Sequence, residues 1–189
     1  MRRRLNPFVP SPRDVLVRAL SEAGVWPDSS LVDLGSGDGR VPMLAAKEFR
    51  AKAVGVEIDG VLVEHAERTR RALGLRGARF VEADARSVDL SSVNFVFTYL
   101  TTDALEAIKP ALLTADKDAL VIAHGYPVKG WTPTEVLRIW SSSTGKHHVF
   151  YLYRIEDALR ARVSEARSLG AVGGAAGSRL RVASLFENT

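Results

Sequence analysis

The sequence predicts an α/β domain with a seven-stranded, mostly parallel sheet, helices on both faces and an antiparallel hairpin at one edge. Short apolar runs alternate with helix-like segments, as in a parallel sheet that is buried on both faces. A glycine-rich loop directly follows the first run, which is typical of a nucleotide-binding βαβ unit. Late in the chain, two alternating polar and apolar segments flank a Ser/Thr/Gly turn, which indicates a hairpin.

The apolar runs and the segments between them define the order of the elements. The first helix is expected to begin at Pro12, to be capped by Ser11, and to end near Ala23. The expected strands are residues 31–34, 53–57, 79–82, 94–99 and 119–124. The expected helices between them are residues 41–48, residues 60–73 stopped by Gly74, and two pieces over residues 103–108 and 110–113.

The chain changes character after the hairpin, whose strands are expected over residues 135–140 and 148–153. The following segments are an amphipathic helix over residues 156–169, a Gly/Ala linker over 170–178, and a short strand or interaction segment over 179–186. We therefore expect a main domain over residues 1–155 and a C-terminal extension over residues 156–189. The order of elements in the main domain is typical of the Rossmann-like sheet of class I methyltransferases.

Composition excludes several classes of protein. The chain has no cysteine, which rules out disulfides, thiolate nucleophiles and cysteine-ligated metals. It has neither an apolar run long enough to span a bilayer nor a signal-peptide pattern, so a cytoplasmic protein is expected. The absence of glutamine and the scarcity of asparagine suggest a thermophilic source. The net charge of +4 is spread along the chain, which favours a solvated surface and leaves acidic partners open.

The glycine loop identifies the kind of cofactor. Its glycines, Gly35, Gly37 and Gly39, read G-x-G-x-G rather than the G-x-G-x-x-G of a dinucleotide site, and no G-K-[ST] follows. Asp33 and Asp38 place negative charge beside the loop. A pyrophosphate would be repelled there, whereas a cofactor that carries cations would be attracted. S-adenosylmethionine, with its sulfonium and ammonium groups, fits this requirement.

Polar residues at strand ends are the candidates for cofactor contacts. Glu57 follows the loop by about 20 residues, where an acid binds ribose hydroxyls in the analogous dinucleotide fold. Asp84 is a candidate acceptor for an adenine amino group, and Asp33 for the cofactor ammonium. Ser11 is a candidate donor to the cofactor carboxylate. Each of these residues also has a structural alternative: a solvated acid, a turn residue, a loop-stabilising acid or a helix cap.

The ends of two later strands are candidates for the transfer site. Tyr99 ends one strand, where its ring would line the site and stabilise a cation. His124 ends the next and is a candidate base or substrate contact, although a lone histidine is more often structural. His147 and His148 are adjacent, so they point to opposite faces of a strand and make a poor metal pair. No metal site is predicted.

Several segments, taken together, resemble the archaeal broad-specificity protein lysine methyltransferases, relatives of the non-SET histone lysine methyltransferases and of a mitochondrial group that acts on part of the ATP synthase. The segments that carry the resemblance are NPFVPSP at residues 6–12, VDLGSGDGR at 32–40, AVGVEI at 53–58, YLTT at 99–102 with Leu105 and KPAL at 109–112, KGW at 129–131 and VFYLY at 149–153. The family differs in two places: this chain has Leu105 where the family tends to carry Asn, and Gly125 where it tends to carry Glu.

The resemblance implies that S-adenosylmethionine donates a methyl group to lysine side chains of proteins, DNA-binding chromatin proteins included. The predicted cofactor contacts are Pro10, Ser11, Asp33, Gly35, Gly37, Glu57, Ile58, Asp84, Ala85 and Tyr99, and the predicted catalytic residues are Tyr99 as the wall of an acceptor channel and His124. Two alternatives stay open. One is an RNA or small-molecule methyltransferase on the same fold. The other is a non-catalytic cofactor-binding adaptor. The sequence has no Asn/Asp-Pro-Pro-Tyr/Phe motif after the fourth expected strand, which argues against methylation of adenine or glutamine.

Overall fold

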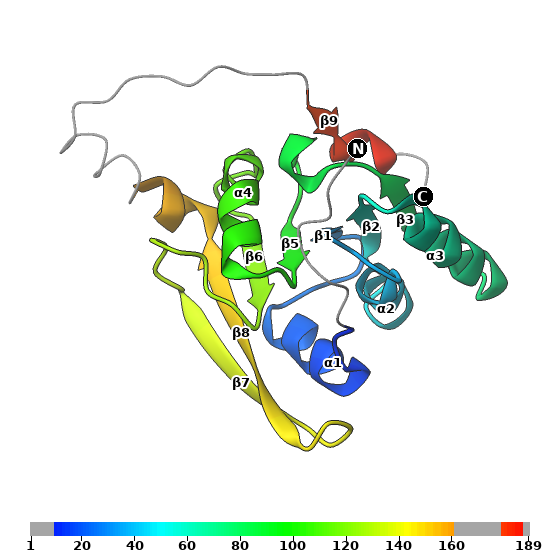
Figure 1. The fold of residues 1–189 in the computed structure, drawn as a ribbon, viewed down its shortest axis with the longest axis horizontal. Coiled ribbons are helices and arrows are strands. Elements are labelled where there is room, and N and C mark those ends of the chain that lie inside the picture. Colours follow the sequence, from blue (N-terminus) through cyan, green and yellow to red (C-terminus); the bar gives the residue numbers. More distant parts are fainter. Residues whose placement is uncertain (1–9, 161–178, 187–189) are drawn as a thin grey trace.

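The computed structural model describes residues 10–160 and 179–186, which form a central sheet covered by helices (Figure 1). The sheet has the strand order β3-β2-β1-β5-β6-β8-β7. Its parallel strands are β1 (Ser30–Leu34), β2 (Lys52–Glu57), β3 (Ala78–Glu82), β5 (Phe95–Thr98) and β6 (Leu120–His124). The predicted seven-stranded α/β fold is therefore confirmed.

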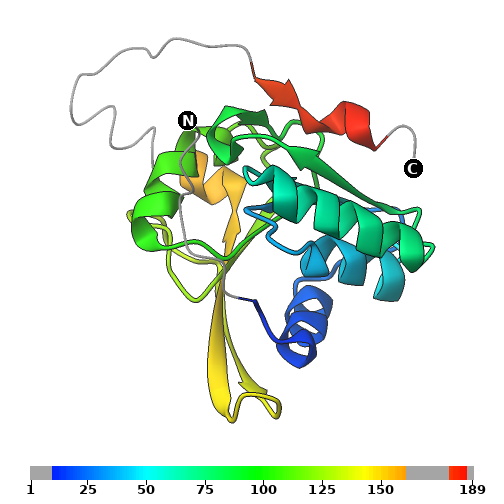
Figure 2. The ribbon, with the colours of Figure 1, turned by 45° about the vertical axis from the view of Figure 1, so that its right-hand side comes forward.

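An antiparallel hairpin completes the sheet. Strands β7 (Glu135–Ser141) and β8 (Lys146–Arg154) pair with each other, and β8 pairs with β6. The hairpin projects beyond the rest of the molecule (Figure 2). Its position at the sheet edge confirms the prediction made from the alternating pattern.

Two apolar cores lie on opposite faces of the sheet, because successive side chains of a strand point to opposite faces. Leu31 and Phe95 pack with helices α1 (Arg13–Glu22) and α2 (Arg40–Glu48) on one face. Val32 and Val96 pack with helix α4 (Thr102–Leu112) on the other. Helix α3 (Gly60–Ala72) packs along β3. It ends before Gly74, whose φ of 65° allows the chain to leave the helix, as predicted.

Two local predictions were wrong. Ser11 does not cap α1, because its hydroxyl forms a hydrogen bond with the distant His124 instead. The two helical pieces expected around residue 109 form one helix, α4, that contains Pro110 in its last turn. The buried face of α4 continues on both sides of Pro110, with Ile108 and Ala111 fully covered. This packing outweighs the single hydrogen bond that the proline removes.

The C-terminal segment 179–186 packs against the main domain. Strand β9 (Leu180–Arg181) pairs in parallel with β4 (Val88–Asp89), and a 3₁₀ turn, η2 (Val182–Leu185), follows. Val182 and Phe186 are buried in the same core as α4. Figure 2 shows this segment at the end of the molecule opposite the hairpin. Residues 155–160 are helical, whereas the rest of the predicted amphipathic helix and the Gly/Ala linker lie outside the described residues.

Within the described ranges, 10–160 and 179–186, no helix is both long and apolar enough to cross a membrane.

Candidate active site

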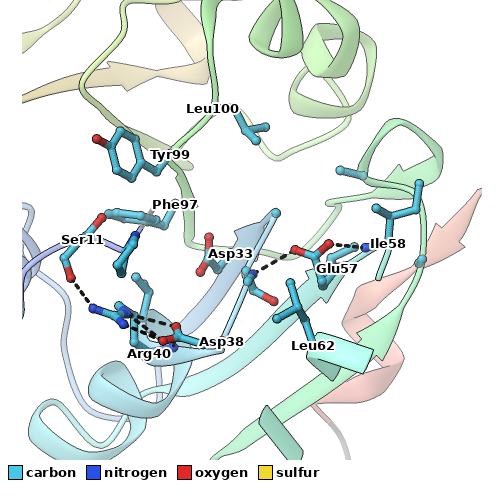
Figure 3. Close-up of a pocket in the computed structure, with 18 of the residues that line it drawn as sticks. Ser11, Asp33, Asp38, Arg40, Glu57, Ile58, Leu62, Phe97, Tyr99 and Leu100 are labelled. Atoms are coloured by element: carbon cyan, nitrogen blue, oxygen red, sulfur yellow. Dashed lines mark hydrogen bonds and ion pairs between the residues drawn. The ribbon is translucent and has the colours of Figure 1, made fainter. Parts of the chain in front are cut away.

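A pocket opens at the carboxyl ends of β1, β2 and β5 (Figure 3). Strand β1 lies between β2 and β5, so the order of the strands reverses at this point, and α/β sheets bind ligands at such reversals. Together with the solvent space at its mouth, the hollow encloses about 830 Å³. All ten predicted cofactor contacts line it: Pro10, Ser11, Asp33, Gly35, Gly37, Glu57, Ile58, Asp84, Ala85 and Tyr99.

Glu57 links the glycine loop to the end of β2. One carboxylate oxygen accepts a hydrogen bond from the Gly37 N–H at 2.9 Å. The other accepts from the N–H groups of Ile58 at 2.9 Å and Asp59 at 3.1 Å. These donors hold the carboxylate in one orientation at the pocket wall, where the oxygen that bonds to Gly37 keeps a lone pair for a hydroxyl group of a ligand.

The glycine loop needs its glycines for packing as well as for backbone conformation. Gly39 has a φ of 79°, and a Cβ at this position would lie 2.4 Å from the Phe80 ring and 2.8 Å from the Ala66 side chain. A side chain would therefore push the loop away from α3 and β3. The close approach brings the start of α2 to the pocket.

Asp33 is the most unusual charge in the pocket. Its side chain is buried, and burial, together with the negative charges of Glu57 and Asp38, raises its pKa well above the ordinary value. In the part of the chain that the structure describes, no basic side chain forms an ion pair with Asp33. A ligand cation at this position would stabilise the carboxylate.

Asp38 differs from Asp33, because Arg40 neutralises it. The Arg40 guanidinium forms hydrogen bonds with both Asp38 oxygens, the shortest at 2.6 Å (Figure 3). A further Arg40 nitrogen donates to the Ser11 carbonyl oxygen at 3.0 Å. Arg40 therefore ties the glycine loop to the N-terminal segment. The sequence analysis did not assign this role, although Arg40 follows the last glycine of the loop directly.

The side of the pocket formed by β2 and β3 is more apolar. Ile58 and Leu62 lie there beside Ala85. Asp84 accepts a hydrogen bond from the Arg86 N–H at 2.9 Å, and its carboxylate also pairs with the Arg86 guanidinium. Arg86 therefore holds the Asp84 side chain at the pocket. The hydrogen bond with Asp84 in turn raises the pKa of Arg86.

Tyr99 and Phe97 form the wall on the β5 side (Figure 3). They are two residues apart along an extended segment, so their side chains point the same way; this spacing was the available signal for Phe97, which the sequence analysis did not single out. Burial raises the pKa of the Tyr99 hydroxyl. Gly125 has a φ of 80°, and a Cβ there would lie 3.0 Å from the Tyr99 ring. Leu105, in contrast, is buried in the core and does not line the pocket.

His124 lies behind the pocket wall. Its Nδ1 is 2.7 Å from the Ser11 hydroxyl oxygen, and its ring packs against that of Tyr99 with a centroid separation of 4.0 Å. Burial, with the nearby His148, lowers the pKa of His124 to about 3. Trp131 packs edge-on against Tyr153 and does not line the pocket. His147 contacts Trp140 on the hairpin.

The donor set fits S-adenosylmethionine group by group. Asp33 is a buried acid with no ion pair among the described residues, which suits an ammonium, and Glu57 is an oriented acceptor for a ribose hydroxyl. Ile58, Leu62 and Ala85 provide an apolar surface for a flat base. The negative charge of Asp33 and Glu57 disfavours phosphate groups at the same place. The fold and the site together define a class I, S-adenosylmethionine-dependent methyltransferase.

Comparison with known proteins narrows this class. Residues 33–135 match the family model described as the ANTKMT methyltransferase domain. The chain is 37% identical over 152 residues to a protein-lysine N-methyltransferase from Saccharolobus islandicus, covering 79% of this chain and 93% of that protein. It is 37% identical over 109 residues to a human lysine N-methyltransferase named for its ATP synthase target, covering 57% of this chain and 46% of the human protein. The chain therefore belongs to the ANTKMT methyltransferase family, among the protein-lysine N-methyltransferases.

A solved structure shows the same fold with bound cofactor product. It is an RNA methyltransferase from Salinibacter ruber in complex with S-adenosyl-L-homocysteine, and it superposes with a TM-score of 0.71 at 30% sequence identity. The match covers 78% of this chain and 94% of the Salinibacter chain. The identification of S-adenosylmethionine as the cofactor and the family resemblance seen in the sequence are both confirmed.

Proposed function

We propose that this protein transfers the methyl group of S-adenosylmethionine to lysine side chains of protein substrates, with DNA-binding chromatin proteins among them. The observation that carries the proposal is the pocket itself. Asp33, a buried acid with no ion-pair partner among the described residues, lines the same pocket as the aromatic side chains of Phe97 and Tyr99, in a chain of this family. The Asp33 carboxyl group suits the ammonium of the methyl donor, and the aromatic wall suits an amine as the methyl acceptor.

Different residues of the pocket bind different parts of the cofactor. Asp33 binds the ammonium group, and Glu57 accepts from the ribose hydroxyls. Asp84 and Ala85 hold the adenine, with Ile58 against its face. The backbone at Gly35 and Gly37 lies close to the methionine portion, where Pro10 and Ser11 close the pocket. These roles follow from the charge and position of each group.

Methyl transfer requires a neutral amine, whereas a free lysine has a pKa of about 10.4. An apolar channel lowers that pKa, and the nearby sulfonium charge acts in the same direction. The proton leaves to water, after which the amine nitrogen forms its bond to the methyl carbon while the carbon–sulfur bond breaks. Alignment of the two reactants supplies roughly 7–11 kcal/mol of the barrier reduction.

Tyr99 forms the wall of the acceptor channel in this proposal. Its ring lies at the pocket surface and is only partly buried. An aromatic face stabilises both the sulfonium and an incoming ammonium by cation–π attraction, worth about 0.5–2 kcal/mol. The ring also limits the directions from which an amine reaches the methyl group.

RNA is the second candidate acceptor. The observation in its favour is the 30% identity to a structure described as an RNA methyltransferase. The chain's pI of about 9.6 is also compatible with a polyanionic substrate. The segment Arg2-Arg3-Arg4, which is basic, lies outside the described residues.

A direct test offers the purified protein radiolabelled S-adenosylmethionine with lysine-rich chromatin proteins, with RNA, or with both. We expect label in protein, and mass spectrometry should locate it on lysine nitrogen. Label in RNA alone would replace the proposal with the second candidate. Label in neither, despite cofactor binding, would favour a non-catalytic adaptor.

The same assay tests Tyr99. Tyr99→Ala should lower kcat by about tenfold or more, while binding of S-adenosyl-L-homocysteine stays within about threefold, because this product lacks the sulfonium charge that the ring stabilises. Tyr99→Phe keeps the aromatic face and should retain most of the activity. A Tyr99→Ala variant with full transfer rate and normal cofactor binding would remove Tyr99 from the channel.

A further inference from the structure

A chain of hydrogen bonds runs from the pocket to the tip of the hairpin. The Ser11 hydroxyl lies 2.7 Å from His124 Nδ1, and His124 Nε2 lies 3.0 Å from His148 Nδ1. The far nitrogen of His148 is 3.0 Å from the Thr144 hydroxyl. Ser11 lines the pocket, whereas Thr144 is exposed in the turn between β7 and β8. None of the steps of methyl transfer described above uses the two histidines.

Both histidine side chains are packed too closely to change their orientation. His124 is 2% exposed and His148 is 9% exposed. The His124 ring lies between the rings of Tyr99 and Phe150, with centroid separations of 4.0 and 4.3 Å. A ring held on both faces cannot flip without moving Tyr99. The hydrogen bonds of His124 therefore stay with the same two partners.

A neutral histidine donates through one nitrogen and accepts through the other. His124 has one partner at each nitrogen, so all the hydrogen bonds of the chain must run in the same direction. If they run from Thr144 inward, His124 donates to the Ser11 oxygen, and the Ser11 hydroxyl is free to donate into the pocket. If they run outward, Ser11 donates to His124 and presents only lone pairs to the pocket.

The outer end of the chain is fixed by helix α1. The Asp14 carboxylate accepts hydrogen bonds from the Ser141 hydroxyl at 3.0 Å and from the Ser142 N–H at 2.9 Å. The Thr144 N–H donates to the Ser141 hydroxyl oxygen at 3.2 Å. The hairpin tip is thus held against the same N-terminal segment that carries Ser11. This contact fixes the positions of Thr144 and Ser11, the two ends of the hydrogen-bond chain, relative to each other.

We propose that His124 and His148 are positioning residues that direct the Ser11 hydroxyl into the pocket as a donor to the carboxylate of bound S-adenosylmethionine. The inward direction follows from the ligand, because a carboxylate needs a hydrogen-bond donor and would be repelled by a Ser11 oxygen that presents only lone pairs. The proposal rests on the cofactor placement given under Proposed function. It extends the binding site to a residue on the hairpin that does not line the pocket.

The test measures the dissociation constant of S-adenosyl-L-homocysteine by calorimetry, together with kcat at saturating cofactor. Ser11→Ala should weaken binding about tenfold, and His148→Phe about three- to tenfold, in line with the loss of an ordered hydrogen bond to a charged group. Because the relay acts through Ser11, His148→Phe should have no further effect, within about twofold, in the Ser11→Ala background. The kcat of His148→Phe should stay within about twofold of the wild type.

Two further variants make the result specific. His147→Phe changes the neighbouring histidine, which is exposed and contacts Trp140 outside the chain of hydrogen bonds, and should bind like the wild type. His148→Asn keeps a polar group toward His124 and should recover most of the affinity, even if His148→Phe folds poorly.

Additive effects of Ser11→Ala and His148→Phe would overturn the relay, as would unchanged binding by His148→Phe. Both outcomes leave wild-type binding and methyl transfer intact, so they are distinct from a failure of the proposed function.

Discussion

At the scale of single residues, the ionised form of Asp33 is unfavourable for folding but favourable for binding a cation. Its pKa in the folded protein lies above the ordinary value of 3.8, so the ionised form is penalised by folding. The carboxylate therefore stabilises the fold only where it is protonated, and that contribution is lost as the pH rises through the raised pKa. At pH values above the ordinary pKa, folding carries a free-energy penalty for this buried group, and a cationic ligand beside it would offset that penalty.

Asp33→Asn should therefore raise the Tm of the cofactor-free protein at neutral pH and weaken S-adenosylmethionine binding by about tenfold or more. The gain in Tm should shrink as the pH falls to values at which wild-type Asp33 is protonated. Thermal scans over a pH series and calorimetry measure the two effects. Asp118→Asn, at an exposed position, is the control and should change neither. A lower Tm for Asp33→Asn at neutral pH would contradict the assignment.

Gly125 is the second residue with a defined consequence. Gly125→Ala places a methyl group 3.0 Å from the Tyr99 ring and forces alanine into a φ of 80°. The backbone strain costs about 1–2 kcal/mol, and the displaced ring should lower kcat several-fold. Gly74→Ala is a matched control, because its φ is 65° and nothing lies within 4 Å of the new Cβ. It should lose similar stability and no activity. Equal activity of the two variants would dissociate Gly125 from Tyr99.

At the scale of elements, the segment 179–186 is closely tied to the pocket. It pairs with β4, which follows the turn that carries Asp84 and Ala85. Arg179 also donates to the Pro110 carbonyl oxygen of α4 at 3.0 Å. We infer that this segment is part of the main domain and supports the adenine end of the site, although the sequence suggested a separate extension from residue 156.

Val182→Ala should lower the stability by about 2 kcal/mol, because it empties a fully buried site. Cofactor affinity should fall with it. Val61→Ala removes the same atoms from a side chain that is 76% exposed, and should leave both quantities unchanged. Thermal unfolding and calorimetry of the two variants test the inference. Unchanged affinity in Val182→Ala, at reduced Tm, would limit the segment to a stabilising role.

At the scale of the whole molecule, the ligand and the fold stabilise each other. S-adenosyl-L-homocysteine at 100 times its Kd should add about 2.7 kcal/mol to the stability. For a domain of this size, that corresponds to a Tm increase of roughly 5–11 °C. ATP offers a similar base and ribose with phosphates, which Asp33 and Glu57 should repel, and should give no increase. A larger Tm increase with ATP than with S-adenosyl-L-homocysteine would contradict the interpretation that the glycine loop favours a cationic cofactor over a phosphate.

The local elements were largely predictable because their signals are local. Each parallel strand of the seven-stranded sheet was predicted within two residues of its observed bounds, from apolar runs that need burial on both faces, whereas the short strand β4 was not predicted. The glycine loop and Glu57 were predictable because their spacing along the chain reflects a single βαβ unit. The continuous helix through Pro110 was missed, because the packing that compensates the proline involves distant residues.

The sequence by itself determined the fold class, the cofactor and ten of the residues that line the pocket. Only the tertiary structure decided which of these groups are paired. Arg40 forms an ion pair with Asp38 and not with Asp33, and the Ser11 hydroxyl bonds to His124 rather than capping its own helix. The physical reason is that hydrogen bonds and charge pairs join residues as far apart as Ser11 and His124. No pattern along the chain specifies such contacts until the sheet has brought its strand ends together.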